Sequence, residues 1–273
     1  MFLNLMYITN DPEVALIAEK NGVDRIWIDL ETLGKEERQK NMNTVKSKHS
    51  ISDIKRIKPL LTKSKLLVRV NPWNPDSENE INQVIEAGAD MIMLPMWKTL
   101  DDVKKFLNVV NKRSKTTLLL ETKEAMECVD EVLENGGFDE IHIGLNDLHL
   151  SLNLKFMFQL LADGTVEKLC NKFKKYNIPY GFGGIAKIGE GLLPAEKIIL
   201  EHYRLGSTRA ILSRSFCDYS KCENYDEVEK IFNANMKQLN DFNLDIKNVS
   251  DDDFKDNIES IKLIVEKIVK SKE

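Results

Sequence analysis

The chain has 273 residues, of which 42% are hydrophobic and 30% are charged, and its formal net charge is −5 at pH 7. This composition is typical of a globular protein with enough chain to bury a large core. It excludes a basic nucleic-acid-binding protein, and no apolar run approaches the roughly 20 residues of a membrane span. We therefore expect neither nucleic acid nor a membrane as a partner.

Two further features favour a cytoplasmic protein. The first ten residues, MFLNLMYITN, lack the basic start and the small-residue cleavage site of a signal peptide, and we interpret them as a strand. The four cysteines show no CxxC spacing, which favours reduced thiols.

Apolar extended runs alternate with helical patterns from the start of the chain to residue 212. The expected strands are Leu3–Ile8, Arg25–Leu30, Leu66–Val70, Asp90–Leu94, Thr116–Leu120, Phe138–Ile143, Ile178–Phe182 and Arg209–Leu212. The main helices expected between them are Pro12–Lys20, Ser52–Leu61, Glu78–Ala87, Leu100–Asn111, Lys155–Tyr176 and Pro194–Tyr203. Eight such units in about 215 residues favour a closed (β/α)8 TIM barrel over an open, doubly wound sheet.

The pattern changes near residue 217, which divides the chain into a catalytic barrel domain, 1–217, and a C-terminal helical extension, 218–273. Two helices are expected in the extension, Tyr225–Asn240 and Asp252–Lys270. The second has an acidic N-terminus and a narrow apolar seam along one face. It is expected to pack on its own barrel or on a neighbouring subunit of a homo-oligomer.

Two neighbouring strands of the predicted barrel each lead into a carboxylate. Glu121 directly follows the fifth strand, and Asp147 lies in the turn after the sixth, within Gly144-Leu145-Asn146-Asp147. The carboxyl ends of adjacent parallel strands lie roughly 4.8 Å apart, so both side chains would point into one space. They could share a divalent cation, Mg²⁺ or Mn²⁺, at about 2.1 Å from each oxygen.

The other strand ends add polar groups to the same mouth, where the chemistry of such barrels takes place. These groups are Asp29 and Glu31, Arg69 and Asn71, Asn146, and the backbone of Gly183 and Gly184. The set suits a hard cation with an anionic, oxygen-rich substrate. It does not suit hydride transfer, because no GxGxxG follows the first strand, and no lysine is placed to form a Schiff base.

Five segments resemble, in order, the motifs of the HpcH/HpaI aldolase and citrate lyase β family: VDRIWIDLE, LLVRVNP, GADMIMLPM, LLLETKEAM and IHIGLNDLHLSL. The likeness covers roughly residues 23–216. It implies a (β/α)8 barrel that makes or breaks a C–C bond next to a pyruvate-like or acyl-CoA enolate with a divalent metal. It also implies that Glu121 and Asp147 are the Mg²⁺ or Mn²⁺ ligands, that Arg69 faces the enolate oxygen, and that backbone amides near Asn146 hold the substrate carboxylate.

The chain departs from that family after the second strand. The pyruvate aldolases carry a histidine directly after the acid there, and this chain has Thr32. The citrate lyase β branch has a lysine and an arginine further on, which Lys35 and Arg38 partly match, but Met96 replaces that branch's lysine after the proline. His49 is the candidate replacement base, and Glu31 could bond a metal-bound water. His149 could lie behind the ligands, whereas His142 and His202 are expected to be structural.

The sequence therefore predicts a metal-dependent (class II) aldolase or lyase for a 2-oxo acid and an aldehyde. Its candidate catalytic residues are Arg69, His49 and Glu31, and its candidate substrate-binding residues are Arg69, Asn71, Asn146, Asp147, Gly183 and Gly184. Two alternatives remain open: an acyl-CoA ester lyase like the citrate lyase β subunit, and a non-catalytic ligand-binding homologue.

Overall fold

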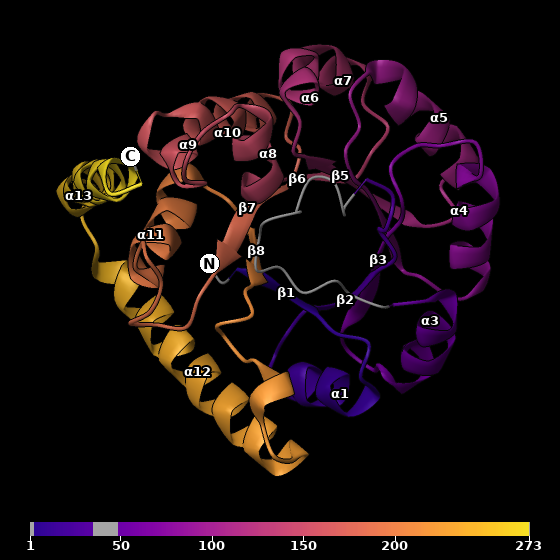
Figure 1. The fold of residues 1–273 in the computed structure, drawn as a ribbon, viewed down its shortest axis with the longest axis horizontal. Coiled ribbons are helices and arrows are strands. Elements are labelled where there is room, and N and C mark those ends of the chain that lie inside the picture. The colour runs from indigo at the N-terminus through magenta and orange to yellow at the C-terminus, as the bar shows by residue number, and fades with distance from the viewer. Residues whose placement is uncertain (1–2, 35–48, 273) are drawn as a thin grey trace.

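A computed structural model describes residues 3–34 and 49–272, and these residues form a closed barrel of eight parallel strands in sequential order. The strands are β1 (Asn4–Ile8), β2 (Arg25–Asp29), β3 (Lys65–Arg69), β4 (Met91–Leu94), β5 (Lys115–Leu120), β6 (Glu140–Ile143), β7 (Tyr180–Ile185) and β8 (Arg209–Leu212). Figure 1 shows them at the centre of a ring of helices. The predicted (β/α)8 barrel is therefore confirmed, and the open sheet is excluded.

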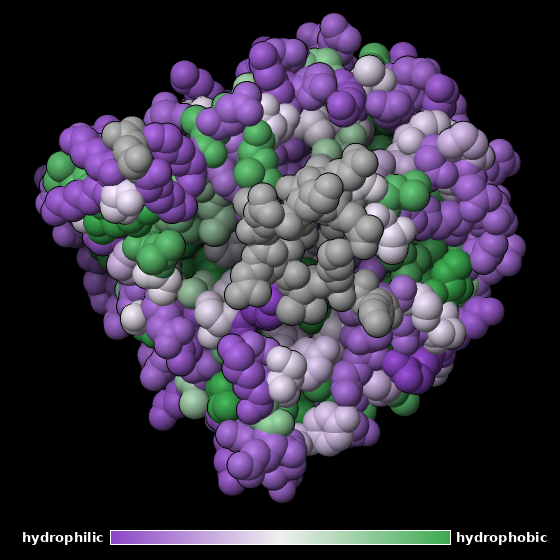
Figure 2. Space-filling view, in the orientation of Figure 1, coloured by the Kyte–Doolittle hydropathy of each residue, from purple (hydrophilic) through white to green (hydrophobic). Residues whose placement is uncertain are grey.

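Apolar helix faces cover the outside of the barrel. The covering helices are α1 (Pro12–Lys20), α3 (Ile51–Ile57), α4 (Ser77–Glu86), α5 (Leu100–Val110), α6 (Lys123–Glu127), α7 (Val129–Asn135), α8 (Leu145–Ser151), α9 (Gln159–Ala162), α10 (Thr165–Lys175) and α11 (Ala195–Leu205). Their outward faces are largely hydrophilic (Figure 2). None of the described helices is both long enough and apolar enough to cross a bilayer.

Several predicted boundaries differ from the structure, among them α12, which continues to Asp245 instead of Asn240. β7 does not stop before Gly183 and Gly184 but continues through both to Ile185, with an irregular register between Gly181 and Gly184. The segment expected as one helix, Lys155–Tyr176, is divided at Gly164, whose φ of +80° ends α9 and precedes α10. The short helix α8, which follows Gly144, was not predicted.

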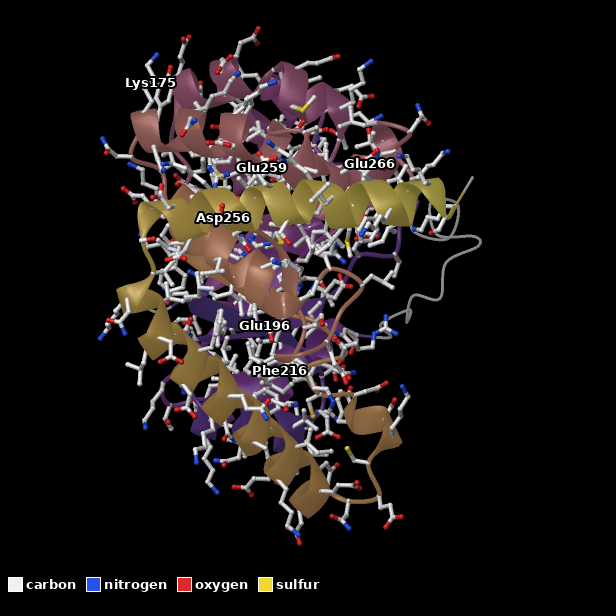
Figure 3. All side chains as sticks on the ribbon, turned by 90° about the vertical axis from the view of Figure 1, so that its left-hand side faces the viewer. Lys175, Glu196, Phe216, Asp256, Glu259 and Glu266 are labelled. Atoms are coloured by element: carbon white, nitrogen blue, oxygen red, sulfur yellow. The ribbon has the colours of Figure 1, made fainter. Side chains whose placement is uncertain are left out.

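The C-terminal helices pack on the barrel of the same chain. Helix α12 (Tyr225–Asp245) lies against α1, and its Phe232 is fully buried with its ring edge-on to Tyr7 at 5.2 Å. Helix α13 (Asp251–Lys270) crosses α11 and α9, as Figure 3 shows from the side. Asn257 of α13 donates to the Lys197 carbonyl and to Glu201. The domain boundary at residue 217 stays a prediction.

The barrel interior has a charged layer, an apolar layer and a polar mouth. At the amino-terminal end, Glu140 accepts hydrogen bonds from Arg25, Arg209 and Thr117, and all but Arg209 are buried. Above it lies an apolar cluster that includes Trp27, Leu67, Met93 and Leu119. Such filled layers leave the carboxyl ends of the strands as the open end of the barrel.

Replacing Glu140 with glutamine should lower the free energy of unfolding by about 3–5 kcal/mol, because Arg25 and Arg209 would lose their buried counterion. Urea denaturation at pH 7 measures the effect. The half-exposed pair of Glu167 and Arg204 provides the control, since Glu167→Gln leaves Arg204 paired with Glu201 and should cost less than about 1 kcal/mol. Equal losses in the two variants would contradict this role for Glu140.

The stability that Glu140 contributes should also depend on pH. Burial raises the pKa of Glu140, but the hydrogen bond and charge of Arg25, together with the charge of Arg209, outweigh it and hold that pKa below its usual range. The stabilisation is therefore complete above the unfolded-state pKa of about 4.3 and is lost as the pH falls through the lower folded-state pKa. The stability difference between wild type and Glu140→Gln should shrink only in that acidic window.

Candidate active site

Arg69 is fixed at the mouth by two buried carboxylates from the neighbouring strand end. Because β2 and β3 pair with Asp29 opposite Arg69, the guanidinium meets Asp29 with Nε at 2.8 Å and Nη2 at 2.9 Å. Nη2 also lies 3.1 Å from Glu31 Oε2, and the guanidinium carbon lies 5.3 Å from the ring centre of Trp27 beneath it. Nε and Nη2 therefore make the contacts that fix the guanidinium among the described residues.

The Arg69 guanidinium stays protonated throughout the physiological pH range. Burial alone would lower its pKa, but the charges of Asp29 and Glu31, the hydrogen bond to Asp29 and the charge of Glu121 raise the pKa above its ordinary value. The effect of Glu121 also places that carboxylate within electrostatic reach of Arg69. Arg69 therefore carries a permanent positive charge at the mouth.

His49 contacts the same cluster from the loop that precedes α3. Its Nδ1 accepts a hydrogen bond of 2.9 Å from the backbone N–H of Asp29. A nitrogen that accepts such a bond carries a lone pair, so the proton of the neutral ring resides on Nε2. The structure thus places His49 beside Asp29, and in this arrangement Nδ1 is not the atom that takes a proton from a substrate.

The side chain of Asn71 links the loop after β2 to helix α4. Its side-chain oxygen accepts from the backbone N–H groups of Thr32 and Leu33 at 2.9 and 3.0 Å. Its side-chain nitrogen donates to Glu80 of α4 at 2.8 Å. These bonds position the loop after β2, which carries Glu31. The predicted substrate contact of Asn71 stays a prediction.

Glu121 lies at the end of β5, 3% exposed, where the backbone N–H of Met96 holds its carboxylate. Its Oε1 accepts from the N–H of Met96 at 3.1 Å. Met96 has a φ of +51°, an uncommon value for a non-glycine residue, and this conformation belongs to the turn that aims its N–H at the carboxylate. On the other side, a Cβ built at Gly144 would lie 2.7 Å from Glu121 Oε2, so only glycine leaves that oxygen its space.

Asp147 lies in the first turn of α8, which begins directly after Gly144. Strands β5 and β6 pair in parallel with Leu120 opposite Ile143, so Glu121 and the start of α8 lie side by side, as predicted. A pocket of about 260 Å³ at this edge of the mouth is lined by Asp147 and by Met96, the residue that holds Glu121. A larger cavity of about 1120 Å³ lies at the opposite, amino-terminal ends of β5 and β6, away from these groups.

Gly183 and Gly184 lie in the irregular part of β7. Gly183 has a φ of +52°, and a Cβ there would meet Leu145 of α8 at 2.6 Å. Its carbonyl is 3.1 Å from Nε2 of the buried His142. Burial lowers the pKa of His142 to about 4, so the ring is neutral and donates to that carbonyl from Nε2. These contacts explain Gly183 by packing, and the predicted substrate contact of both glycines stays a prediction.

The remaining histidines are also engaged. His202 is stacked on Phe182 with ring centres 3.8 Å apart, and its Nδ1 is 2.7 Å from Ser207 Oγ. His149 is buried on α8, and its Nδ1 is 3.3 Å from the Leu145 carbonyl. Lys35 and Arg38, which partly match the citrate lyase β branch, lie outside the described residues. Asn146 lies beside Asp147 in the first turn of α8.

The donor set of the mouth fits a hard divalent cation. Within the described ranges, no three His, Cys, Asp or Glu side chains are grouped as a metal site. Glu121 and Asp147 would instead supply two carboxylate ligands, with substrate and water completing an octahedral ion. Gly144 leaves room for the Glu121 carboxylate at the start of α8.

The chain matches known proteins in sequence and in fold. The family model of the HpcH/HpaI aldolase/citrate lyase family matches residues 3–157, more than half of the chain. No curated protein sequence matches. Solved structures do match, among them an HpcH/HpaI aldolase from Desulfitobacterium hafniense DCB-2, with a TM-score of 0.61 and 14% identity over 80% of this chain and 90% of that one.

Two more solved structures share the fold. An HpcH/HpaI aldolase/citrate lyase family protein from Burkholderia cenocepacia J2315 has a TM-score of 0.61 and 14% identity, covering 78% of this chain and 88% of its own. The citrate synthase SbnG has a TM-score of 0.58 and 16% identity, covering 77% and 86%. At these identities the structural likeness establishes the fold, and the family model goes further. The chain belongs to the HpcH/HpaI aldolase/citrate lyase family.

Proposed function

We propose that this protein is a divalent-metal-dependent aldolase that cleaves or forms the C–C bond of a 4-hydroxy-2-oxo acid through a pyruvate-type enolate. Membership of a family of aldolases and citrate lyases supports a lyase-type function. The finer assignment rests mainly on one observation: Asp29 and Glu31 hold Arg69 at the carboxyl ends of the barrel strands, where Glu121 is also buried at the end of β5. The proposed enzyme is a cytoplasmic homo-oligomer.

The two sides of the mouth would perform different tasks. Glu121 and Asp147 would hold Mg²⁺ or Mn²⁺, which, when bound, supplies Lewis-acid chemistry to the ketone and carboxylate oxygens of a 2-oxo acid. Arg69 contributes a fixed positive charge through Nη1 at the oxygen where negative charge develops. Because its other donors are held by Asp29 and Glu31, the guanidinium is already oriented before substrate binds.

The reaction balances without a further reactant. In cleavage, the 4-hydroxyl loses its proton, the C3–C4 bond breaks, and its electron pair moves to C3 as the enolate while C4 leaves as the aldehyde. Water takes up the proton of the 4-hydroxyl and returns one to C3, which gives pyruvate or a substituted 2-oxo acid. Because His49 Nδ1 accepts from the N–H of Asp29, the neutral ring carries its proton on Nε2, and we assign His49 to hydrogen-bond donation from Nε2 to a substrate oxygen rather than to proton transfer.

A panel of 4-hydroxy-2-oxo acids and acyl-CoA thioesters tests this proposal. We expect release of pyruvate from a 4-hydroxy-2-oxo acid, loss of activity on chelation, and recovery on addition of Mg²⁺ or Mn²⁺. Activity confined to acyl-CoA thioesters would contradict the aldolase and favour the citrate lyase β-like alternative. Absence of turnover on the whole panel, with metal-dependent binding of 2-oxo acids, would favour a non-catalytic homologue.

A further inference from the structure

Glu80 is a partly buried carboxylate that the proposed reaction does not use. It lies in the first turn of α4, and Oε1 accepts from Asn71 Nδ2 at 2.8 Å. The backbone N–H of Asn71 is 3.2 Å from both carboxylate oxygens. Glu80 forms no ion pair within residues 3–34 and 49–272, and burial raises its pKa although these hydrogen bonds lower it. Withdrawing a carboxylate from water without a cation costs free energy, which is offset here by bonds that hold Asn71.

Asn71 in turn holds the loop after β2. Its Oδ1 accepts from the N–H groups of Thr32 and Leu33 at 2.9 and 3.0 Å, and from the Thr32 hydroxyl at 3.3 Å. Two residues before Thr32, the N–H of Leu30 donates to the Arg69 carbonyl at 2.9 Å. The side chain of Asn71 therefore continues the pairing of β2 with β3 beyond the point where the two strands end.

Glu31 lies between these two fixed points of the backbone. Leu30 is held on one side of it and Thr32 on the other, and its Oε2 lies 3.1 Å from Nη2 of Arg69. If the backbone after β2 shifts, the Glu31 carboxylate shifts with it, and Arg69 loses one of the two carboxylates that orient its guanidinium. A misplacement of about 1 Å can lower a reaction rate by about 100-fold. The hydrogen bonds that start on α4 therefore bear on the orientation of Arg69.

We propose that Glu80 is a positioning residue of this site: acting through Asn71, it fixes the loop after β2 and so keeps Glu31 in contact with Arg69. The inference rests on the aldolase function proposed above and adds to it a residue on α4, outside the strand ends. It also assigns Asn71 to the loop instead of the substrate, because its Oδ1 already accepts from three donors.

Two measurements separate this inference from the function on which it rests. Amide hydrogen exchange, followed by NMR without substrate, reports the bonds that Thr32 and Leu33 donate. In Glu80→Ala both amides should exchange about tenfold faster, the effect of losing one hydrogen bond to a charged group. Pyruvate release from a 4-hydroxy-2-oxo acid reports catalysis, and kcat should fall by about 10–100-fold with little change in KM. Glu80→Gln keeps an oxygen that accepts from Asn71 and should restore both values to nearly those of the wild type.

Glu78→Ala is the matched control. Glu78 is exposed in the same first turn of α4, so its carboxylate interacts with the same helix dipole. Its replacement should leave amide exchange and kcat unchanged. Asn71→Ala should reproduce both effects of Glu80→Ala, and the double variant should be no slower than Asn71→Ala alone, because both changes break one series of hydrogen bonds.

Three results would overturn this inference and leave the aldolase standing. The first is wild-type amide exchange and kcat in Glu80→Ala, and the second is a loss in Glu80→Gln as large as that in Glu80→Ala. The third is a double variant whose loss is the product of the two single losses, which would describe independent roles, with Asn71 contacting the substrate. Absence of pyruvate release in the wild type would overturn both the aldolase and this inference.

Discussion

Replacing Glu121 with glutamine should abolish metal-dependent cleavage while leaving the protein folded. Glutamine keeps the size of the side chain and can still accept the hydrogen bond from the N–H of Met96, but it cannot supply a carboxylate to a cation. Loss of a group that only supports a metal ligand typically lowers metal affinity or activity by about 10–100-fold. Loss of a ligand itself should therefore lower kcat by more than about 100-fold. Pyruvate release under saturating Mg²⁺ measures the effect.

Glu127→Gln is the matched control. Glu127 lies on α6, a few residues beyond Glu121, and its exposed carboxylate forms an ion pair with Lys123 at 3.7 Å. This variant should retain full activity and the same response to Mg²⁺. Turnover of Glu121→Gln within a few-fold of the wild type, at unchanged thermal stability, would remove Glu121 from the metal site.

Replacing Arg69 with lysine should lower kcat by about 10²–10³-fold, the usual effect of removing one preorganised donor from a developing charge. An ammonium group keeps the charge but cannot bond Asp29 through two nitrogens, contact Glu31 and present a further donor at the same time. Steady-state kinetics with a 4-hydroxy-2-oxo acid measures this. The loss should appear in kcat more than in KM, because the charge on the enolate oxygen develops during bond cleavage.

Arg56→Lys tests whether any arginine-to-lysine change has this effect. Arg56 is half-exposed on α3, where it pairs with Asp53 at 2.7 Å and donates to the Asn10 carbonyl. Its replacement should change kcat by less than twofold. The account would be wrong about Arg69 if Arg69→Lys kept its kcat and lost only stability, since that result describes a purely structural ion pair.

The barrel could be predicted because each strand is a short apolar run between clear turn signals. The run Thr116–Leu120 followed by Glu121 is typical of a strand buried on both faces, and the structure places it in β5, beside β6. The same reasoning fails at the glycines of β7. The sequence predicts that the strand ends before Gly183, whereas the left-handed backbone of Gly183 and its contact with Leu145 belong to an irregular part within the strand.

The side chains of the site were easier to predict than the groups that hold them. Glu121, Asp29, Glu31 and Arg69 follow from their places at strand ends, where a barrel collects its functional groups. The N–H of Met96, the space at Gly144 and the acceptor role of His49 Nδ1 could not be predicted. Backbone groups carry no sequence signal, and a hydrogen bond between a loop histidine and a distant strand depends on how the loop closes.

The central claim is that Glu121 and Asp147 hold one divalent cation next to Arg69. Anomalous scattering from crystals grown with Mn²⁺ and pyruvate tests it most directly. We predict one manganese peak within about 2.1–2.3 Å of an oxygen from each carboxylate, a range typical of hard divalent ions, with pyruvate bound between the ion and the Arg69 guanidinium. A peak that contacts neither carboxylate, or pyruvate bound away from Arg69, would contradict the proposed site.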